Sequence, residues 1–323
     1  MIKILSIDGG GIRGIIPAMI LSEIEKRTGK PISKLFDIIA GTSTGGILAL
    51  GLVKPNGKGN PAYSAKELIK LYEIEGNNIF SNTIWHKIES ADGLLEEKYP
   101  SAGIESVLKK YFNETRLSEA LTNVIIPSYE IEQRKPWFFK SFYAKDISKK
   151  NEDFLMRDAA RATSAAPTYF EPAKINLNSE LSYIALIDGA VFANNPSMCA
   201  YAEAKSIFQK NDDILLVSLG TGEHTRPILY NNTIDWGLAR WARPILGVVF
   251  DGINDTVDYQ LKQLLKPKHD SKRYYRFQVE LDIGNNDIDD ASQINIHFLK
   301  LLAEKLMSET DDDIINLCRQ LNA

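Results

Sequence analysis

Ser43 is the centre of the sequence GTSTG at Gly41–Gly45, which lies between two apolar runs, Phe36–Ala40 and Gly46–Leu50. The pattern predicts a strand that turns sharply into a helix, because glycine on each side of the turn removes side chains that would clash. The hydroxyl group would then lie at a helix N-terminus, where unpaired backbone N–H groups stabilise negative charge. We interpret Ser43 as a nucleophile, although a glycine-rich loop with a helix-capping serine would give the same pattern.

A second glycine-rich turn, Asp8–Gly14 (DGGGIRG), directly follows the first apolar run of the chain. Consecutive glycines allow backbone N–H groups to approach an oxygen that carries negative charge, as in an oxyanion hole. If the strands that precede the two turns are adjacent and parallel, this loop lies beside Ser43. Arg13 would either steady the loop or help to hold the oxyanion. The candidate oxyanion-hole residues are therefore Gly9, Gly10, Gly11 and Arg13.

The same turn also fits the dinucleotide-binding pattern G-x-G-x-x-G through Gly9, Gly11 and Gly14. A Rossmann protein needs an acidic residue at the end of its second strand to bind a ribose. Here Asp37 precedes the second strand, and the Ser43 turn occupies its end. The spacing therefore argues against a dinucleotide site, which we keep only as an alternative.

A serine nucleophile needs a base, and the chain offers two kinds of candidate. Asp188 ends the apolar run Tyr183–Ile187, and the carboxyl ends of strands are where α/β sheets keep their sites. A carboxylate there can take the proton of a serine directly. The alternatives are a turn aspartate that bonds to its own backbone and a Ser–His pair through His224. The other histidines lie away from the ends of predicted core strands; they are His86, His269 and His297.

Strand-like and helix-like runs alternate along the chain, which predicts an α/β fold with a mostly parallel sheet and helices on both faces. The alternating runs are Ile2–Ile7, Gly14–Arg27, Asp37–Ala40, Thr44–Val53, Tyr183–Ile187, Pro196–Phe208 and Ile214–Leu219. A helical insertion is predicted by Ser64–Glu75 and Ser101–Phe112, and a strand pair by Val124–Ile131 and Trp137–Tyr143. The last part of the chain predicts a strand at Tyr274–Leu281 and helices at Ile294–Met307 and Asp311–Leu321.

The composition suits one α/β domain over residues 1–323, since 44% of the residues are hydrophobic and 25% are charged. The net charge of −4, with no dense Lys/Arg stripe, argues against a nucleic-acid polymer as partner. Two distant cysteines give neither a disulfide framework nor metal-ligand spacing. The N-terminal residues resemble a strand rather than a signal peptide, and no apolar run is long enough to span a membrane, so we expect a cytoplasmic protein.

The motifs, and their order along the chain, resemble those of the patatin-like phospholipases, which are lipid acyl hydrolases. The matching segments are Asp8–Gly14, Gly41–Gly46 and Asp188–Ala190 followed by Asn194–Pro196, with lesser matches at Ala162–Pro167 and Ser218–Gly222. The resemblance covers a catalytic core of roughly the first 225 residues and leaves 226–323 without an assigned role. One departure is Ala190, where the family usually has glycine.

The resemblance implies a three-layer α/β/α fold with Ser43 as nucleophile, Asp188 as base, and an oxyanion hole formed by the residues named above. It also implies hydrolysis of phospholipid acyl esters through an acyl-enzyme, without a metal or other cofactor. The substrate would be met at a membrane surface, so the protein would bind membranes peripherally and transiently. The segment Trp236–Phe250, with two tryptophans and two arginines before an apolar stretch, would suit a lid or a membrane contact, or else core packing.

Bacterial patatin-like effectors of antiphage defence, activated by cyclic oligonucleotides, resemble this chain in length and in lacking extra domains. That resemblance implies a cyclic oligonucleotide as activator of a regulated enzyme. The alternatives are a constitutive lysophospholipase or general esterase, and a catalytically idle binding protein on the same fold. The sequence leaves the oligomeric state open, a homo-oligomer included.

Overall fold

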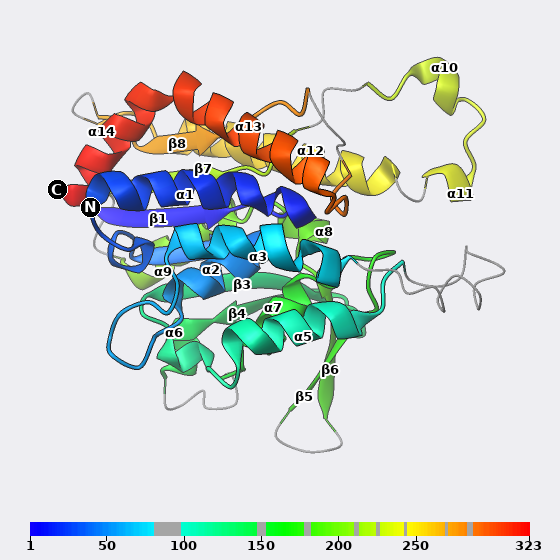
Figure 1. Cartoon of the computed structure of the whole chain (residues 1–323), viewed down its shortest axis with the longest axis horizontal. Helices are drawn as coiled ribbons and strands as arrows, with labels where there is room; N and C mark the ends of the chain where they lie inside the picture. Colours follow the sequence, from blue (N-terminus) through cyan, green and yellow to red (C-terminus); the bar gives the residue numbers. More distant parts are fainter. Residues whose placement is uncertain are drawn as a thin grey trace.

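The centre of the protein is an eight-stranded sheet, seen in a computed structural model of the whole chain (Figure 1). The structure describes residues 1–80, 98–146, 153–177, 182–209, 213–223, 227–241, 244–268, 271–282 and 287–323. The strands are β1 (Ile2–Ile7), β2 (Ile38–Gly41), β3 (Asn123–Glu130), β4 (Lys135–Lys140), β5 (Ala173–Asn176), β6 (Tyr183–Asp188), β7 (Ile214–Leu219) and β8 (Tyr274–Phe277). Their order is β5-β6-β3-β2-β1-β7-β8, and β4 pairs with β3.

The sheet is mostly parallel, as predicted. Strands β3, β2, β1, β7 and β8 are neighbours in that order and all run in the same direction. Strand β6 was expected among these parallel strands, and that expectation is wrong, because β6 is antiparallel to both β3 and β5. Its partner β5, which the sequence did not predict, forms a hairpin with it, and a hairpin forces antiparallel pairing.

Helices cover both faces of the sheet, which confirms the predicted three layers (Figure 1). Side chains alternate between the faces along each strand, so that Leu5 and Ile7 of β1 join one core and Ile2 and Ile4 the other. The larger core includes helices α1 (Ile15–Thr28), α2 (Thr44–Val53), α3 (Ala65–Ile79), α5 (Ser101–Phe112), α7 (Met156–Thr163), α13 (Gln293–Glu309) and α14 (Asp311–Asn322). The smaller core includes α9 (Ser197–Ile207) and α12 (Pro244–Leu264).

Helix α2, which follows the Ser43 turn, is the most deeply placed helix of the larger layer. All ten of its residues are buried, which agrees with a sequence that is apolar on every side of the helix. The two helices of the predicted insertion, α3 and α5, pack against α1 and α7 and against each other. They therefore belong to the same layer as α2.

The C-terminal residues complete both the sheet and its larger helical layer. Strand β8 pairs with β7, and α13 and α14 pack against α1. Two predicted strands extend too far, because the fourth strand ends at Lys140 and is followed by α6 (Ser141–Ala144), and β8 ends at Phe277. Helix α12 was not predicted. Helix α12 begins with two turns that are apolar on every side, so the 3.6-residue period that marks a helix is absent there.

Shorter helical segments join these elements. They are η1 (Gly11–Gly14), η2 (Ile32–Lys34), η3 (Leu117–Glu119), α8 (Ala190–Ala193), α10 (Tyr230–Thr233) and α11 (Leu238–Trp241). Figure 1 shows that α10 and α11 project from the body next to the first turns of α12. Within the described ranges, no helix combines the length and the apolar character that crossing a bilayer requires.

Candidate active site

Ser43 lies in the sharp turn between β2 and α2 that the sequence predicted. Its backbone angles, φ 55° and ψ −125°, fall in a region that residues other than glycine rarely adopt, at a cost of roughly 1–3 kcal/mol. The flanking glycines are required by close approach: a Cβ atom on Gly41 would lie 2.1 Å from the carbonyl oxygen of Gly45, and one on Gly45 would lie 2.2 Å from that of Ile7. The tightness of the turn therefore needs both glycines.

A threonine from α7 holds this turn in place. The Ser43 N–H group donates a hydrogen bond to Thr163 Oγ1 at 3.0 Å, and the Thr163 hydroxyl donates to the Pro127 carbonyl oxygen at 2.6 Å. Thr163 belongs to one of the two lesser motifs, for which the sequence suggested no role. The strained backbone of Ser43 is thus connected directly to β3.

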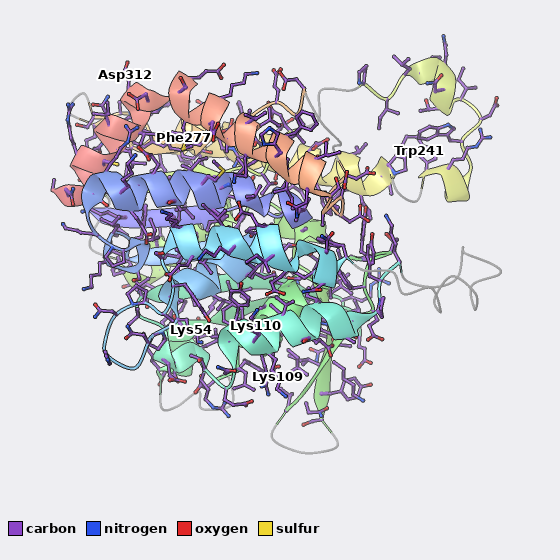
Figure 2. All side chains as sticks on the ribbon, in the orientation of Figure 1. Lys54, Lys109, Lys110, Trp241, Phe277 and Asp312 are labelled. Carbon is purple, nitrogen blue, oxygen red and sulfur yellow. The ribbon has the colours of Figure 1, made fainter. Side chains whose placement is uncertain are left out.

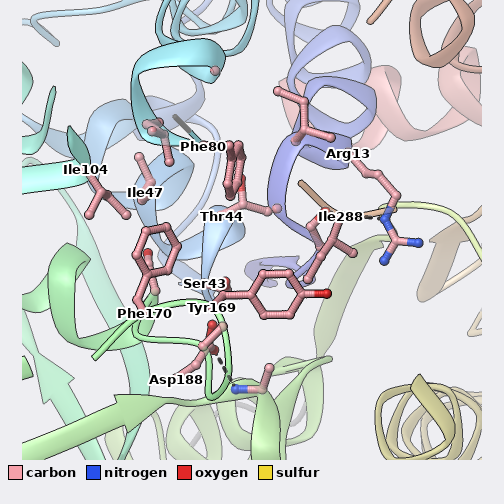
Figure 3. Close-up of a pocket in the computed structure, with 18 of the residues that line it drawn as sticks. Arg13, Ser43, Thr44, Ile47, Phe80, Ile104, Tyr169, Phe170, Asp188 and Ile288 are labelled. Carbon is pink, nitrogen blue, oxygen red and sulfur yellow. Dashed lines mark hydrogen bonds between the residues drawn. The ribbon is translucent and has the colours of Figure 1, made fainter. Parts of the chain in front are cut away.

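Asp188 reaches Ser43 because β2 and β6 share one edge of β3. Strand β3 pairs with β2 through Asn123–Ile125 and with β6 through Ser128–Glu130, while β4 occupies its other edge. Because β2 is parallel to β3 and β6 is antiparallel to it, the C-terminal ends of β2 and β6 point toward each other along β3. Ser43 follows the end of β2 and Asp188 ends β6, so the two side chains meet (Figure 3).

The Asp188 carboxyl group is almost completely buried, with 2% of the residue exposed. Burial raises its pKa from the ordinary 3.8 to about 7, against the lowering effect of hydrogen bonds from the Ala190 N–H group and the Ser43 hydroxyl. The Ala190 bond is 2.8 Å long and ends on Oδ1. Near neutral pH, a carboxyl group with this pKa can both accept and return a proton.

The glycine loop that follows β1 lies beside this pair, since β1 and β2 are adjacent and parallel. Its Gly9 N–H group is already engaged with the Asn194 carbonyl oxygen at 3.0 Å, and Thr221 Oγ1 donates to the Gly9 carbonyl oxygen at 2.6 Å. Gly10 and Gly11 line the cavity above Ser43, and their N–H groups make no hydrogen bond to a described residue. The N–H groups of Gly10 and Gly11 are therefore the candidate oxyanion donors, while the hydrogen bonds of Gly9 hold the loop in place.

Arg13, at the end of this loop, is 6% exposed. Its Nε atom donates to the Gly10 carbonyl oxygen at 3.3 Å. Burial lowers the pKa of the guanidinium group to about 10, and the Asp251 and Asp287 carboxylates partly oppose that effect. Of the two roles that the sequence left open for Arg13, the Gly10 contact supports steadying the loop.

Two contacts from the C-terminal part of the chain brace the same loop. The Ile12 N–H group donates to the Ile288 carbonyl oxygen at 2.8 Å. Beneath the loop, Arg276 Nη2 of β8 lies 2.7 Å from Asp8 Oδ2, and its Nη1 donates to Ser218 Oγ at 2.9 Å. Burial raises the pKa of Asp8 to about 6, although Arg276 acts to lower it. Sequence reasoning missed both Arg276 and Ile288, because neither lies in a motif.

The cavity above Ser43 is mostly apolar (Figure 3). Helix α3 supplies four of the lining residues and α5 supplies Ile104, so the predicted helical insertion shapes the site. The apolar lining includes Ile47, Leu71, Ile79, Phe80, Ile104 and Phe170. A second groove adjoins this cavity, and the residues that line both are Arg13, Ala166, Tyr169, Asn194, Phe250 and Ile288. An acyl chain is a suitable ligand for such a wall.

No histidine of the described residues lines this cavity. His297 is exposed on α13, while His86, His224 and His269 lie outside the described residues. Within the described ranges, no group of three His, Cys, Asp or Glu side chains is arranged to hold a metal ion. Asp188 is therefore the base candidate that the structure brings to Ser43.

Comparison with known proteins agrees with this site. The family model for patatin-like phospholipases matches residues 5–201. Patatin-like protein 4 of Arabidopsis thaliana is 32% identical over 95% of this chain and 83% of its own length. Patatin-like protein 2 of Oryza sativa subsp. indica is 33% identical over 96% and 84%. The crystal structure of VipD from Legionella pneumophila covers 94% of this chain and 67% of its own at 12% identity, but its TM-score of 0.35 is too low to support an argument.

The family match spans more than half of the chain and includes the Ser43 turn, the glycine loop and Asp188. The relatives align over nearly the whole sequence, including the C-terminal part that carries Arg276 and Ile288. The chain therefore belongs to the patatin-like phospholipase family and is a lipid acyl hydrolase of the serine hydrolase type.

Proposed function

We propose that this protein hydrolyses fatty-acyl esters of membrane phospholipids through a Ser43–Asp188 dyad. The observation that carries the proposal is the contact between the Ser43 hydroxyl and a buried carboxyl group whose pKa is raised to about 7. A base with that pKa is matched to neutral pH, where general base catalysis is most effective. The apolar cavity above the pair favours an acyl chain over a polar substrate.

In the first half of the reaction, Asp188 takes the hydroxyl proton while Ser43 Oγ attacks the ester carbonyl carbon. The carbonyl oxygen becomes an oxyanion, which the N–H groups of Gly10 and Gly11 stabilise. When the tetrahedral intermediate collapses, the bond to the alcohol oxygen breaks and Asp188 returns the proton to that oxygen. A lysophospholipid leaves, and the fatty acid remains esterified to Ser43.

In the second half, water takes the place of the alcohol. Asp188 removes a proton from the water as its oxygen attacks the acyl carbon, and the same loop stabilises the second oxyanion. Collapse breaks the bond to Ser43 Oγ, which regains the proton from Asp188. The fatty acid leaves and the enzyme is restored. No step in this sequence requires a metal ion or another cofactor.

The test is fatty-acid release from mixed phospholipid vesicles, measured by mass spectrometry. We expect release by the parent protein and none by Ser43→Ala, with circular dichroism showing that the variant is folded. A parallel assay with lysophospholipids and a soluble short-chain ester separates a phospholipase from a lysophospholipase or general esterase. Release by Ser43→Ala at the parental rate would overturn the assignment of the nucleophile.

Activation by a cyclic oligonucleotide, and with it a role in antiphage defence as a cytoplasmic effector, stays a prediction from the family resemblance. Its motivation is that unregulated phospholipid hydrolysis would harm the cell that makes the enzyme. The vesicle assay tests it when repeated with a panel of cyclic dinucleotides and trinucleotides. Rates that do not change with any member of the panel would support the alternative of a constitutive enzyme.

A further inference from the structure

The first two turns of α12 are apolar on every side but are not buried. Residues 244–250 contain no charged side chain. A helix of that composition is normally buried in a core or in lipid, yet Ile245 is 42% exposed, Val248 44% and Val249 36%. The sequence left core packing and membrane contact open for this segment, and the exposure of these side chains argues against core packing.

The preceding residues add to the same exposed surface. Leu229, Tyr230 and Ile234 are 55%, 79% and 60% exposed. The rings of Trp236 and Trp241 pack edge to face, with centroids 5.2 Å apart. Figure 2 shows Trp241 well away from the packed body in which Phe277 lies. We call residues 228–241 and 244–250 the apolar arm.

The apolar arm borders the groove that adjoins the catalytic cavity. Phe250 lines the cavity above Ser43, and Ile228, Leu246 and Val248 line the groove that adjoins it. Apolar side chains thus extend from the exposed surface along part of the groove to the catalytic cavity, and the rest of the groove lining includes Lys98, Asp287 and Asp289. Exposed apolar patches of this kind mark sites of interaction with proteins, membranes or ligands.

We propose that the apolar arm docks on the surface of a phospholipid bilayer and places the groove against the lipids. The inference rests on the proposed function, because it takes the substrate from a bilayer. A second copy of the chain on this face would cover the groove through which substrate enters, whereas a bilayer would supply the substrate there. The paired tryptophans suit this position, since indole rings favour the boundary between acyl chains and water.

The charges around the apolar arm fit shallow docking. Asp235 and Arg240 are exposed within the apolar arm, and Asp251 follows the apolar turns of α12 at the side of the groove. Apolar side chains would enter the boundary between headgroups and acyl chains, while these charged groups stay among the headgroups. Docking of this kind is peripheral, because the apolar side chains reach only the boundary between headgroups and acyl chains.

The binding test uses phosphatidylcholine vesicles and the Ser43→Ala protein, so that the vesicles are not consumed. The test variant adds Leu229→Ser, Ile245→Ser and Val249→Ser, three exposed positions outside both the cavity and the groove. We expect its partition coefficient, measured by co-sedimentation, to fall at least about tenfold, because each side chain loses a transfer into apolar surroundings. The matched control, Tyr259→Ser with Leu264→Ser, removes exposed side chains from the far end of α12 and should bind like its parent.

Equal binding by the test variant and its parent would overturn the proposal, as would a parent that does not bind vesicles. Sedimentation velocity without lipid tests whether a second copy of the chain covers the apolar arm instead. A dimer that the triple substitution abolishes would assign the surface to self-association and also overturn the proposal. Circular dichroism spectra that match the parent would confirm that the exposed substitutions leave the fold intact.

Activity separates failure of this proposal from failure of the proposed function. With Ser43 intact, the three arm substitutions should lower hydrolysis of vesicle phospholipid in step with binding and leave hydrolysis of p-nitrophenyl butyrate, a soluble ester, unchanged. A parent protein that hydrolyses neither substrate, with or without the panel of cyclic oligonucleotides, would contradict the proposed function, while the co-sedimentation result would still decide whether the apolar arm binds lipid. Equal vesicle hydrolysis by parent and variant would count against the apolar arm alone.

Discussion

The buried carboxyl group of Asp188 links catalysis to stability, and Asp188→Asn separates the two. The asparagine side chain has nearly the same shape and can still accept the Ala190 N–H bond, but it has no proton-accepting carboxylate. We expect the variant to release no fatty acid. We also expect it to gain stability relative to the parent as pH rises, because it never has to bury a charge.

The direction and size of the change in stability with pH follow from the raised pKa of Asp188. In the unfolded chain the carboxyl group ionises near its ordinary 3.8, whereas in the folded protein it ionises near 7. The parent therefore loses stability as pH rises from about 4 to about 7 and then stays level. Counting about 1.4 kcal/mol for each pKa unit, the loss is about 4 kcal/mol at pH 8 and about 1–2 kcal/mol at pH 5.

The side-chain N–H donors of the asparagine are buried without a partner, which lowers the stability of the variant by about 1–3 kcal/mol at every pH. The quantity to measure is therefore the change with pH: the stability of Asp188→Asn minus that of the parent should increase by about 2–3 kcal/mol between pH 5 and pH 8. Asp8, whose pKa is raised to about 6, contributes equally to both proteins and cancels.

Urea unfolding at pH 5, 6, 7 and 8, followed by circular dichroism, measures this difference. The control is Asp312→Asn, which removes an exposed carboxylate at the start of α14 (Figure 2) and should change stability by under about 1 kcal/mol. In the parent, kcat/KM should fall about tenfold for each pH unit below 7. A stability difference that is constant from pH 5 to pH 8, or full activity in Asp188→Asn, would refute the reasoning.

Three further predictions concern the turn at Ser43, the ion pair beneath the glycine loop and the absence of a metal from the mechanism. Gly45→Ala places a Cβ atom 2.2 Å from the Ile7 carbonyl oxygen, so we expect a loss of several kcal/mol in thermal unfolding and little activity. The contrasting change Gly252→Ala in α12 meets nothing within 4 Å and should stabilise by up to about 1 kcal/mol. Arg276→Met leaves Asp8 buried without its cation and should cost about 3–5 kcal/mol in urea unfolding, much of it recovered when Asp8→Asn is added. If the stability losses of Arg276→Met and Asp8→Asn simply add in the double variant, the two side chains do not interact. Fatty-acid release should persist in EDTA, and a loss that calcium restores would contradict the metal-independent mechanism.

The sequence was most informative where chemistry depends on local backbone geometry. The GTSTG turn requires small residues at fixed positions, so the sharp turn at Ser43 could be predicted from five letters, while its strained backbone angles came from the structure. The acidic end of an apolar run marked Asp188 in the same way. The prediction of Ser43 relied on a short-range constraint that any fold with this turn must satisfy, whereas the meeting of Asp188 with Ser43 depends on the pairing of β6 with β3.

Contacts between distant segments were not predictable in this way. The direction of β6 depends on its hairpin with β5, a four-residue strand whose sequence gave no clear signal. Arg276 pairs with Asp8 across the sheet, and an arginine in a strand looks the same whether it faces water or a buried carboxylate. The exposure of the apolar turns of α12 also depends on what lies around them, which composition alone does not specify.

The bracing of the glycine loop by Ile288 and Arg276 has a consequence for the order in which the enzyme is completed. Asp8 and Ile12 are synthesised more than 200 residues before their partners Arg276 and Ile288. A nascent chain can therefore contain the nucleophile and the base while its oxyanion loop still lacks these two supports. We expect catalytic competence to appear only after Arg276 and Ile288 have been synthesised and have folded against the loop, so that chains still lacking them do not attack lipids near the ribosome.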